Sequence, residues 1–178
     1  MKKILGTILL VIYSIIVITV TILLLSYNEY LCSEINGYTF YIVKDDSLEP
    51  RFVKGDLLII NQSSTKNINV GEKIFLYQNV SSNEYYVKYG EVTNIEEQAN
   101  RIVYTIDNQY QYDSSYLIGK EEGSYFFNKI GTILGILESR WGYLFCIVIV
   151  TLLLFLEELY ELCMEIKYIN EVEVKEGE

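Results

Sequence analysis

The chain of 178 residues contains no histidine, and this absence excludes two large classes of catalytic mechanism. A Ser-His-Asp triad and a Cys-His pair both need an imidazole that accepts a proton near neutral pH. The three cysteines, Cys32, Cys146 and Cys163, lie far apart and lack the short spacing of metal ligands. The sequence therefore predicts no metal site, no cofactor and no disulfide framework.

Basic residues are also scarce. Fourteen lysines and arginines stand against 24 aspartates and glutamates, and the formal net charge is −10. Proteins hold nucleic acids largely through contacts from lysine and arginine to phosphates. No basic patch that would make such contacts is visible in this chain. Nucleic acid is therefore not expected as a partner.

Proline occurs only once, as Pro50. Proline fixes its own φ and disfavours helical geometry at Glu49, so we expect Ser47 at the edge of a strand rather than in a helix. The pair Gly55-Asp56 and the apolar run 57–60 follow. An ordinary turn between two strands explains this pattern, and a serine hydroxyl presented in a fixed pose is the alternative.

Charge is absent from residues 4–27, a run of 24 residues that follows Lys2 and Lys3. This length exceeds the ~20 residues that span a bilayer. A cleavable signal peptide competes, but its apolar core has ~7–15 residues and ends at a cleavage site of small residues. The sequence favours a retained transmembrane helix, with residues 1–3 in the cytoplasm according to the positive-inside rule.

Residues 28–128 contain short segments rich in aromatic and β-branched residues, separated by turn signals. We predict a mainly β domain between two transmembrane helices, built as a small antiparallel sheet or a partly closed barrel. The expected strands are 38–43, 57–60, 70–77, 84–93, 101–106 and 116–120.

Two further apolar segments precede an acidic end. Residues 129–140 are interrupted by glycine and are expected to lie along the membrane surface. Residues 141–157 have an uncharged run slightly short of a full span, so a core helix competes with a second transmembrane helix. The absence of a polar face and Trp141 at one end favour the membrane. Residues 158–178 are expected to form an acidic cytoplasmic tail, with apolar residues at helical spacing in its first half.

The residues around Ser47 resemble the nucleophile box of type I signal peptidases. That box reads approximately S-x-S-M-x-P followed by G-D, and the chain has DDSLEP at 45–50 with Gly55-Asp56 after it. The resemblance implies that Ser47 is the nucleophile of a multi-pass endopeptidase of the cell membrane. Its catalytic domain would face outward, and it would remove signal peptides from secreted pre-proteins. The implied partners are the lipid bilayer and those signal peptides.

Lys88 is the candidate general base. A serine hydroxyl needs a base within hydrogen-bond reach, and without histidine a desolvated lysine is the remaining choice. Lys88 lies in the apolar run 85–92, which resembles the segment of signal peptidases that carries the base lysine. An outward-facing lysine on a strand is the alternative.

Two aspartates complete the predicted site. The stretches around Asp107 and Asp113 resemble the late boxes of signal peptidases, where a Gly-Asp-Asn stretch and a later aspartate precede Ile-Gly-Lys. The resemblance gives both residues a supporting role that orders the site. Ordinary turn aspartates are the alternative.

The chain departs from the family at Asp45, where the family has a serine or threonine hydroxyl that helps to form the oxyanion hole. An ionised carboxylate accepts hydrogen bonds but cannot donate them, and it repels a developing oxyanion. Asp45 and Asp46 therefore favour an alternative function, a catalytically inactive, signal-peptidase-like module anchored in the membrane for binding or assembly. A sheath or transport component without peptidase ancestry is a third possibility, in which the match at Ser47 is coincidental.

Overall fold

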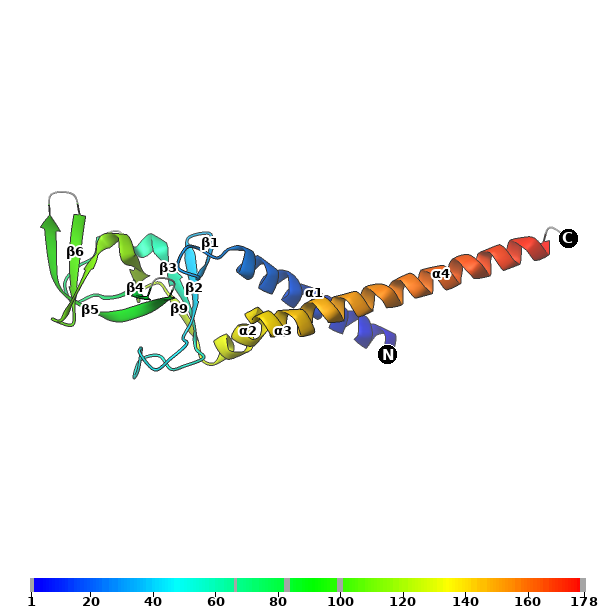
Figure 1. Ribbon diagram of the computed structural model, residues 1–178, viewed down its shortest axis with the longest axis horizontal. Coiled ribbons are helices and arrows are strands. Elements are labelled where there is room, and N and C mark those ends of the chain that lie inside the picture. The colour runs from blue at the N-terminus through cyan, green and yellow to red at the C-terminus, as the bar shows by residue number, and fades with distance from the viewer. Residues whose placement is uncertain (1, 66, 82–83, 99–100, 177–178) are drawn as a thin grey trace. The chain divides into compact units, whose positions relative to one another are not determined.

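A computed structural model describes residues 2–65, 67–81, 84–98 and 101–176 (Figure 1). The chain divides into two compact units, Met1–Gly135 and Ile136–Glu178. The first unit holds an apolar helix and all the described strands, and the second holds the long C-terminal helix.

Helix α1 (Lys2–Leu25) is apolar along its length, and Gly6–Leu25 is long and apolar enough to cross a membrane. Hydroxyl groups of its serines and threonines donate hydrogen bonds to backbone carbonyl oxygens one turn earlier in the helix. Ser14 Oγ, for example, donates to the Leu10 carbonyl at 2.9 Å. These bonds satisfy the hydroxyl groups without water, as an apolar surrounding requires.

The first antiparallel sheet follows α1 and has the strand order β1-β2-β3-β9. Asn36 and Gly37 form the two-residue loop between β1 and β2 with φ values of 50° and 79°. This is the geometry of the type I′ turn that Asn-Gly favours in hairpins. The strands are β1 (Ser33–Ile35), β2 (Tyr38–Ile42), β3 (Leu57–Asn61) and β9 (Tyr125–Phe127).

The second antiparallel sheet has the strand order β7-β6-β5-β4-β8. Short 3₁₀ turns, η1 (Gln62–Thr65) and η2 (Ser114–Tyr116), precede β4 and β8. The strands are β4 (Lys73–Ser81), β5 (Glu84–Gln98), β6 (Arg101–Ile106), β7 (Tyr110–Asp113) and β8 (Leu117–Lys120).

The antiparallel β character predicted from the sequence is confirmed. Among the described residues, the strand pairings form two sheets and do not close into a barrel. β4 begins at Lys73 rather than at residue 70, because Gly71 adopts a φ of 91° in the preceding turn. β1, β7 and β9 were not predicted, since three or four residues are too few to show an alternating pattern.

Two hydrophobic cores lie against opposite faces of the second sheet. Phe75 and Tyr77 of β4 belong to the first core, together with residues from β2, β3 and the segment between them. Ile74 and Leu76, which alternate with them along the strand, belong to the second core with residues of β5 and β6. Alternate side chains of a strand point to opposite faces, so β4 contributes to both cores.

Asp56 joins the segment that carries Ser47 to the start of helix α2 (Ile130–Glu138). Its side chain is only 4% exposed. One carboxylate oxygen accepts the Val53 backbone N–H at 3.0 Å, and the other accepts the Lys129 backbone N–H at 3.0 Å. The Gly-Asp pair therefore fixes two segments that are more than seventy residues apart in the sequence.

Gly55 allows this junction to be close. Its φ is 91°, a backbone conformation that residues with a side chain rarely adopt. A Cβ atom at this position would also overlap the side chain of Thr132. The Gly55 carbonyl accepts the Thr132 backbone N–H at 3.0 Å, which adds a second attachment for α2. Only glycine satisfies both the backbone conformation and the approach of the helix.

Apart from Ser139, the second unit is helical throughout its described part. Ser139 caps α3 (Arg140–Gly142), and its Oγ accepts the Gly142 N–H at 3.0 Å. A π-helical turn, η3 (Tyr143–Ile149), leads into α4 (Val150–Glu176). Residues Arg140–Tyr168 are long and apolar enough to cross a membrane. The helix continues well beyond residue 157, where the predicted span ended.

The Asp56 junction predicts a clear stability effect. Asp56→Ala leaves two backbone N–H groups without their acceptor, so we expect the free energy of unfolding to fall by on the order of 2 kcal/mol. Thermal unfolding of the detergent-solubilised protein, followed by circular dichroism, measures the change. Asp46→Ala is the matched control, because Asp46 is exposed and its side chain has no hydrogen bond to any residue that the structure describes. Equal stability of the two variants would contradict the role given to Asp56.

Candidate functional site

Ser47 lies in a turn between β2 and β3, and its side chain is exposed. The expectation that it sits on a strand edge is wrong. The chain instead turns tightly here, because the Phe52 backbone N–H donates to the Leu48 carbonyl at 3.0 Å and the Glu49 N–H donates to the Asp46 carbonyl at 3.2 Å. Leu48 and Phe52 are buried in the first core and anchor the turn.

The backbone N–H of Ser47 already has an acceptor. It donates to a carboxylate oxygen of Asp45 at 3.0 Å, which is the Asx-turn geometry common for aspartate two residues before an amide. In an acyl transfer by Ser47, this N–H would have to stabilise the oxyanion. The Asp45 carboxylate therefore already accepts the Ser47 N–H that such a reaction needs, and it places negative charge beside this N–H.

Lys88 lies on the other face of the second sheet. Its neighbours Val87 and Tyr89 pack against the first core, the core that also contains the anchors of the Ser47 turn. Lys88 itself is paired across the strands with Leu76, a member of the second core. Because paired residues of an antiparallel sheet share a face, Lys88 projects away from the core beneath Ser47.

The contact of the Lys88 side chain agrees with this placement. Its ammonium nitrogen lies 5.1 Å from the centre of the Tyr110 ring, within the range of a cation–π interaction. Within the described parts of the chain, no hydrogen bond joins Lys88 to Ser47. The structure does not bring the two predicted catalytic residues together.

Asp107 and Asp113 both occupy turns. Asp107 and Asn108 have φ values of 51° and 56° between β6 and β7, and a carboxylate oxygen of Asp107 accepts the Glu91 N–H at 3.0 Å. Asp113 caps η2 by accepting the Ser115 N–H at 2.9 Å, and this hydrogen bond lowers the pKa of its carboxyl group. Among the described residues, no hydrogen bond joins either side chain to Ser47 or Lys88: Asp107 ties the β6–β7 turn to β5, and Asp113 caps η2.

A polar cluster that the sequence did not reveal lies next to the Ser47 turn. One carboxylate oxygen of Glu121 accepts two N–H bonds from Arg51, at 2.6 and 2.8 Å, and the other accepts the Tyr89 hydroxyl at 2.6 Å. Burial alone would raise the pKa of Glu121, but the hydrogen bonds from Tyr89 and Arg51 outweigh it, and the net pKa is lowered. Burial and the bond to Glu121 raise the pKa of Tyr89.

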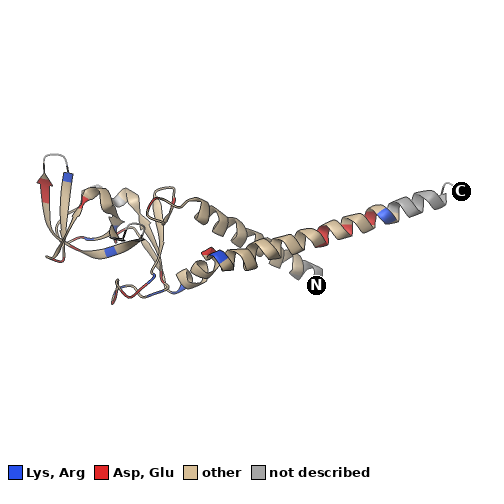
Figure 2. Ribbon diagram, in the orientation of Figure 1, with Lys and Arg blue, Asp and Glu red and all other residues tan. Residues whose placement is uncertain are grey.

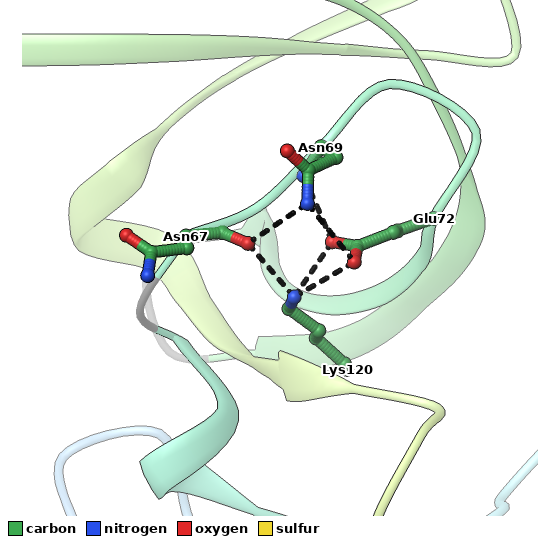
Figure 3. A network of polar contacts seen from close by, with 4 residues as sticks. All are labelled: Asn67, Asn69, Glu72 and Lys120. Carbon is green, nitrogen blue, oxygen red and sulfur yellow. Dashed lines mark hydrogen bonds and ion pairs between the residues drawn. The ribbon is translucent and has the colours of Figure 1, made fainter.

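A second network ties the loop before β4 to β8 (Figure 3). The Lys120 ammonium forms an ion pair with Glu72, with a shortest distance of 2.7 Å, and donates to the Asn67 carbonyl at 2.8 Å. The backbone N–H of Asn69 donates to the same carboxylate at 2.8 Å. The hydrogen bond from Lys120 is the main cause that lowers the pKa of Glu72.

These two networks border an open cavity of about 460 Å³. Three cations and three carboxylates line it, so the cavity has no dominant charge. The lining residues are Arg51, Gly71, Glu72, Lys73, Lys120, Glu121, Glu122 and Phe126. Arg51 and Glu121 are 70 residues apart in the sequence, and neither belongs to a recognisable motif. Their contact is therefore evident from the fold and not from the sequence. Across the described ranges, no cluster of three or more metal-ligating side chains is present.

Comparison with protein-family models gives no match to this chain, and comparison with curated proteins gives none either. The resemblance to type I signal peptidases therefore depends on the residues of the chain itself, chiefly the box around Ser47 and the Gly55-Asp56 pair.

The Glu72–Lys120 pair predicts a pH-dependent contribution to stability. The pKa of Glu72 is lowered from its ordinary value of 4.5, so its ionised form stabilises the fold above that pH, and the contribution is lost as the pH falls through the folded-state pKa. Glu72→Gln should lower the free energy of unfolding at pH 7 by up to about 1 kcal/mol, and the difference from the parent should shrink as the pH falls toward 3.

Denaturant unfolding of both proteins between pH 3 and pH 7 measures this difference. Glu49→Gln provides the control, because Glu49 is exposed and its side chain has no hydrogen bond or ion pair in the described structure. A loss of stability in Glu72→Gln that is the same at both pH values would show that the pair makes no electrostatic contribution.

Proposed function

We propose that this protein is a membrane-anchored, signal-peptidase-like module that binds or assembles rather than hydrolyses. The observation that carries the proposal is the hydrogen bond from the Ser47 backbone N–H to the Asp45 carboxylate, at 3.0 Å. A carboxylate at this position opposes the developing negative charge of an acyl-transfer transition state.

The placement of Lys88 supports the same proposal. A serine becomes a nucleophile when a base within about 3 Å takes its proton. Lys88 instead lies over Tyr110, on the sheet face opposite the core that anchors the Ser47 turn. Both observations favour a module that binds over one that hydrolyses.

The proposed arrangement in the membrane has the β domain on the outer face. The two apolar helices would cross the bilayer, and Lys2 and Lys3 would keep the N-terminus in the cytoplasm. The resemblance around Ser47 suggests secreted pre-proteins as the ligand class, held through the signal-peptide region without cleavage.

A serine endopeptidase with a Ser47–Lys88 dyad is the second candidate. It is favoured by the exposure of Ser47 on a turn whose anchors, Leu48 and Phe52, are buried. Such a turn presents a hydroxyl group in a fixed pose. Catalysis would require Asp45 to release the Ser47 N–H and Lys88 to reach the opposite side of its sheet.

Incubation of the detergent-solubilised protein with a secretory pre-protein tests the two candidates, with the products analysed by mass spectrometry. We expect no cleavage by the parent protein or by the variants Ser47→Ala and Lys88→Ala. Asp45→Ser should not cleave either, because a hydroxyl group at position 45 supplies no base for Ser47. Cleavage by the parent that is lost in both Ser47→Ala and Lys88→Ala would establish the peptidase and overturn the module.

The same pre-protein, carrying a photo-cross-linker in its signal peptide, tests binding. The module predicts equal cross-linking to the parent and to Ser47→Ala, since the Ser47 hydroxyl takes no part in binding by this account. A chain that neither cleaves nor cross-links the pre-protein would exclude signal peptides as its ligand.

A further inference from the structure

Helix α4 carries its acidic residues beyond the apolar part of the chain, where they recur along the helix (Figure 2). Between Glu157 and Tyr168 there are four glutamates and one lysine. A helix rises 1.5 Å per residue, so the 29 residues of Arg140–Tyr168 extend ~44 Å. The hydrocarbon core is ~30 Å thick, so the end of this stretch lies outside it.

An apolar stripe follows one side of α4 through this region. Its residues are spaced alternately three and four apart, the heptad spacing that one helix presents to another. Each of them is 40–53% exposed, and no described residue of the helical unit covers them. The apolar stripe consists of Leu159, Leu162 and Ile166, which lie beyond the uncharged run.

Glutamates line one edge of the apolar stripe. Glu158 and Glu165 precede Leu159 and Ile166 by one position, and Glu161 lies one turn from each of them. Together with Phe155, Leu159 and Leu162 they border a shallow groove of about 300 Å³. We call Glu158, Glu161 and Glu165 the acidic edge.

Lipid is a poor occupant for the part of the stripe beyond the hydrocarbon. The cytoplasmic leaflet carries anionic lipids that attract basic segments and repel acidic ones. A helix with the acidic edge would therefore be held away from the headgroups rather than laid on them.

A second copy of α4 is also a poor occupant. In an antiparallel pairing Glu158 and Glu165 would face the same glutamates of the other copy, and like charges are destabilising. In a parallel pairing Glu158 would face Cys163, which carries no positive charge. Neither arrangement neutralises the acidic edge.

We propose that the apolar stripe and the acidic edge form a docking surface for an amphipathic helix with lysine or arginine along one side. The stripe would bury the apolar face of the partner helix, and the acidic edge would pair with its cations. This surface does not involve Ser47 or a ligand on the opposite side of the membrane, and it rests on the proposed topology, in which residues 158–178 lie in the cytoplasm.

The test uses the full-length protein in nanodiscs of phosphatidylcholine and a fluorescent 21-residue amphipathic helix built from leucine and lysine. A matched peptide with glutamate in place of lysine and empty nanodiscs are the controls. We expect the basic peptide to bind the protein-loaded nanodiscs at least about tenfold more tightly than either control, and to weaken as salt is raised.

Two variants locate the site. Reversing the acidic edge with Glu158→Lys, Glu161→Lys and Glu165→Lys should weaken binding of the basic peptide about tenfold, whereas Glu157→Lys, on the opposite side of the helix, should change it less than twofold. Equal weakening by both, or no preference for the basic peptide, would overturn the proposal. So would oxidation of Cys163 to a disulfide-linked dimer that no longer binds the peptide, because that result assigns the stripe to a second copy.

Discussion

The buried carboxylate of Asp56 is the constraint on which the β unit depends. It accepts backbone N–H groups from Val53 and Lys129, and the adjacent Gly55 carbonyl accepts another from Thr132. A buried carboxylate is tolerated only when donors of this kind satisfy it. These bonds fix the end of the Ser47 segment, the start of β3 and the start of α2 at one point. The Gly-Asp pair is thus explained by structure, with no appeal to catalysis.

This junction supports the turn that carries Ser47. The turn that it supports holds Ser47 with its amide bonded to Asp45. Alternate side chains of the second sheet point to opposite faces, and Lys88 lies on the face that carries the second core. The anchors of the Ser47 turn lie in the first core, on the other face. Lys88 thus projects from the face of the sheet opposite to the core that contains these anchors. The bond from the Ser47 N–H to Asp45 and the contact of Lys88 with Tyr110 are the two observations that favour the proposed binding module over the peptidase.

Much of the framework was predictable, because it follows from local pattern. The uncharged runs indicated both apolar helices, and dense β-branched and aromatic segments indicated β2, β3 and β6. The face of Lys88 was not predictable, since tyrosine and valine lie on both sides of it and leave no alternation to read. The contact of Arg51 and Tyr89 with Glu121 joins distant segments and has no local signal. The helical extension of α4 was expected only as a short helix, because its apolar stripe is narrow and its composition is acidic.

The separation of Ser47 from Lys88 is tested most directly by disulfide formation between Ser47→Cys and Lys88→Cys in a background without the three native cysteines. A disulfide requires Cα atoms within about 7 Å. Lys73→Cys with Glu91→Cys is the positive control, because these exposed residues are direct partners across β4 and β5. The account predicts that oxidation links the control pair and leaves the Ser47–Lys88 pair unlinked. Efficient linkage of residues 47 and 88 in the folded protein would contradict their separation and would favour the peptidase with a Ser47–Lys88 dyad.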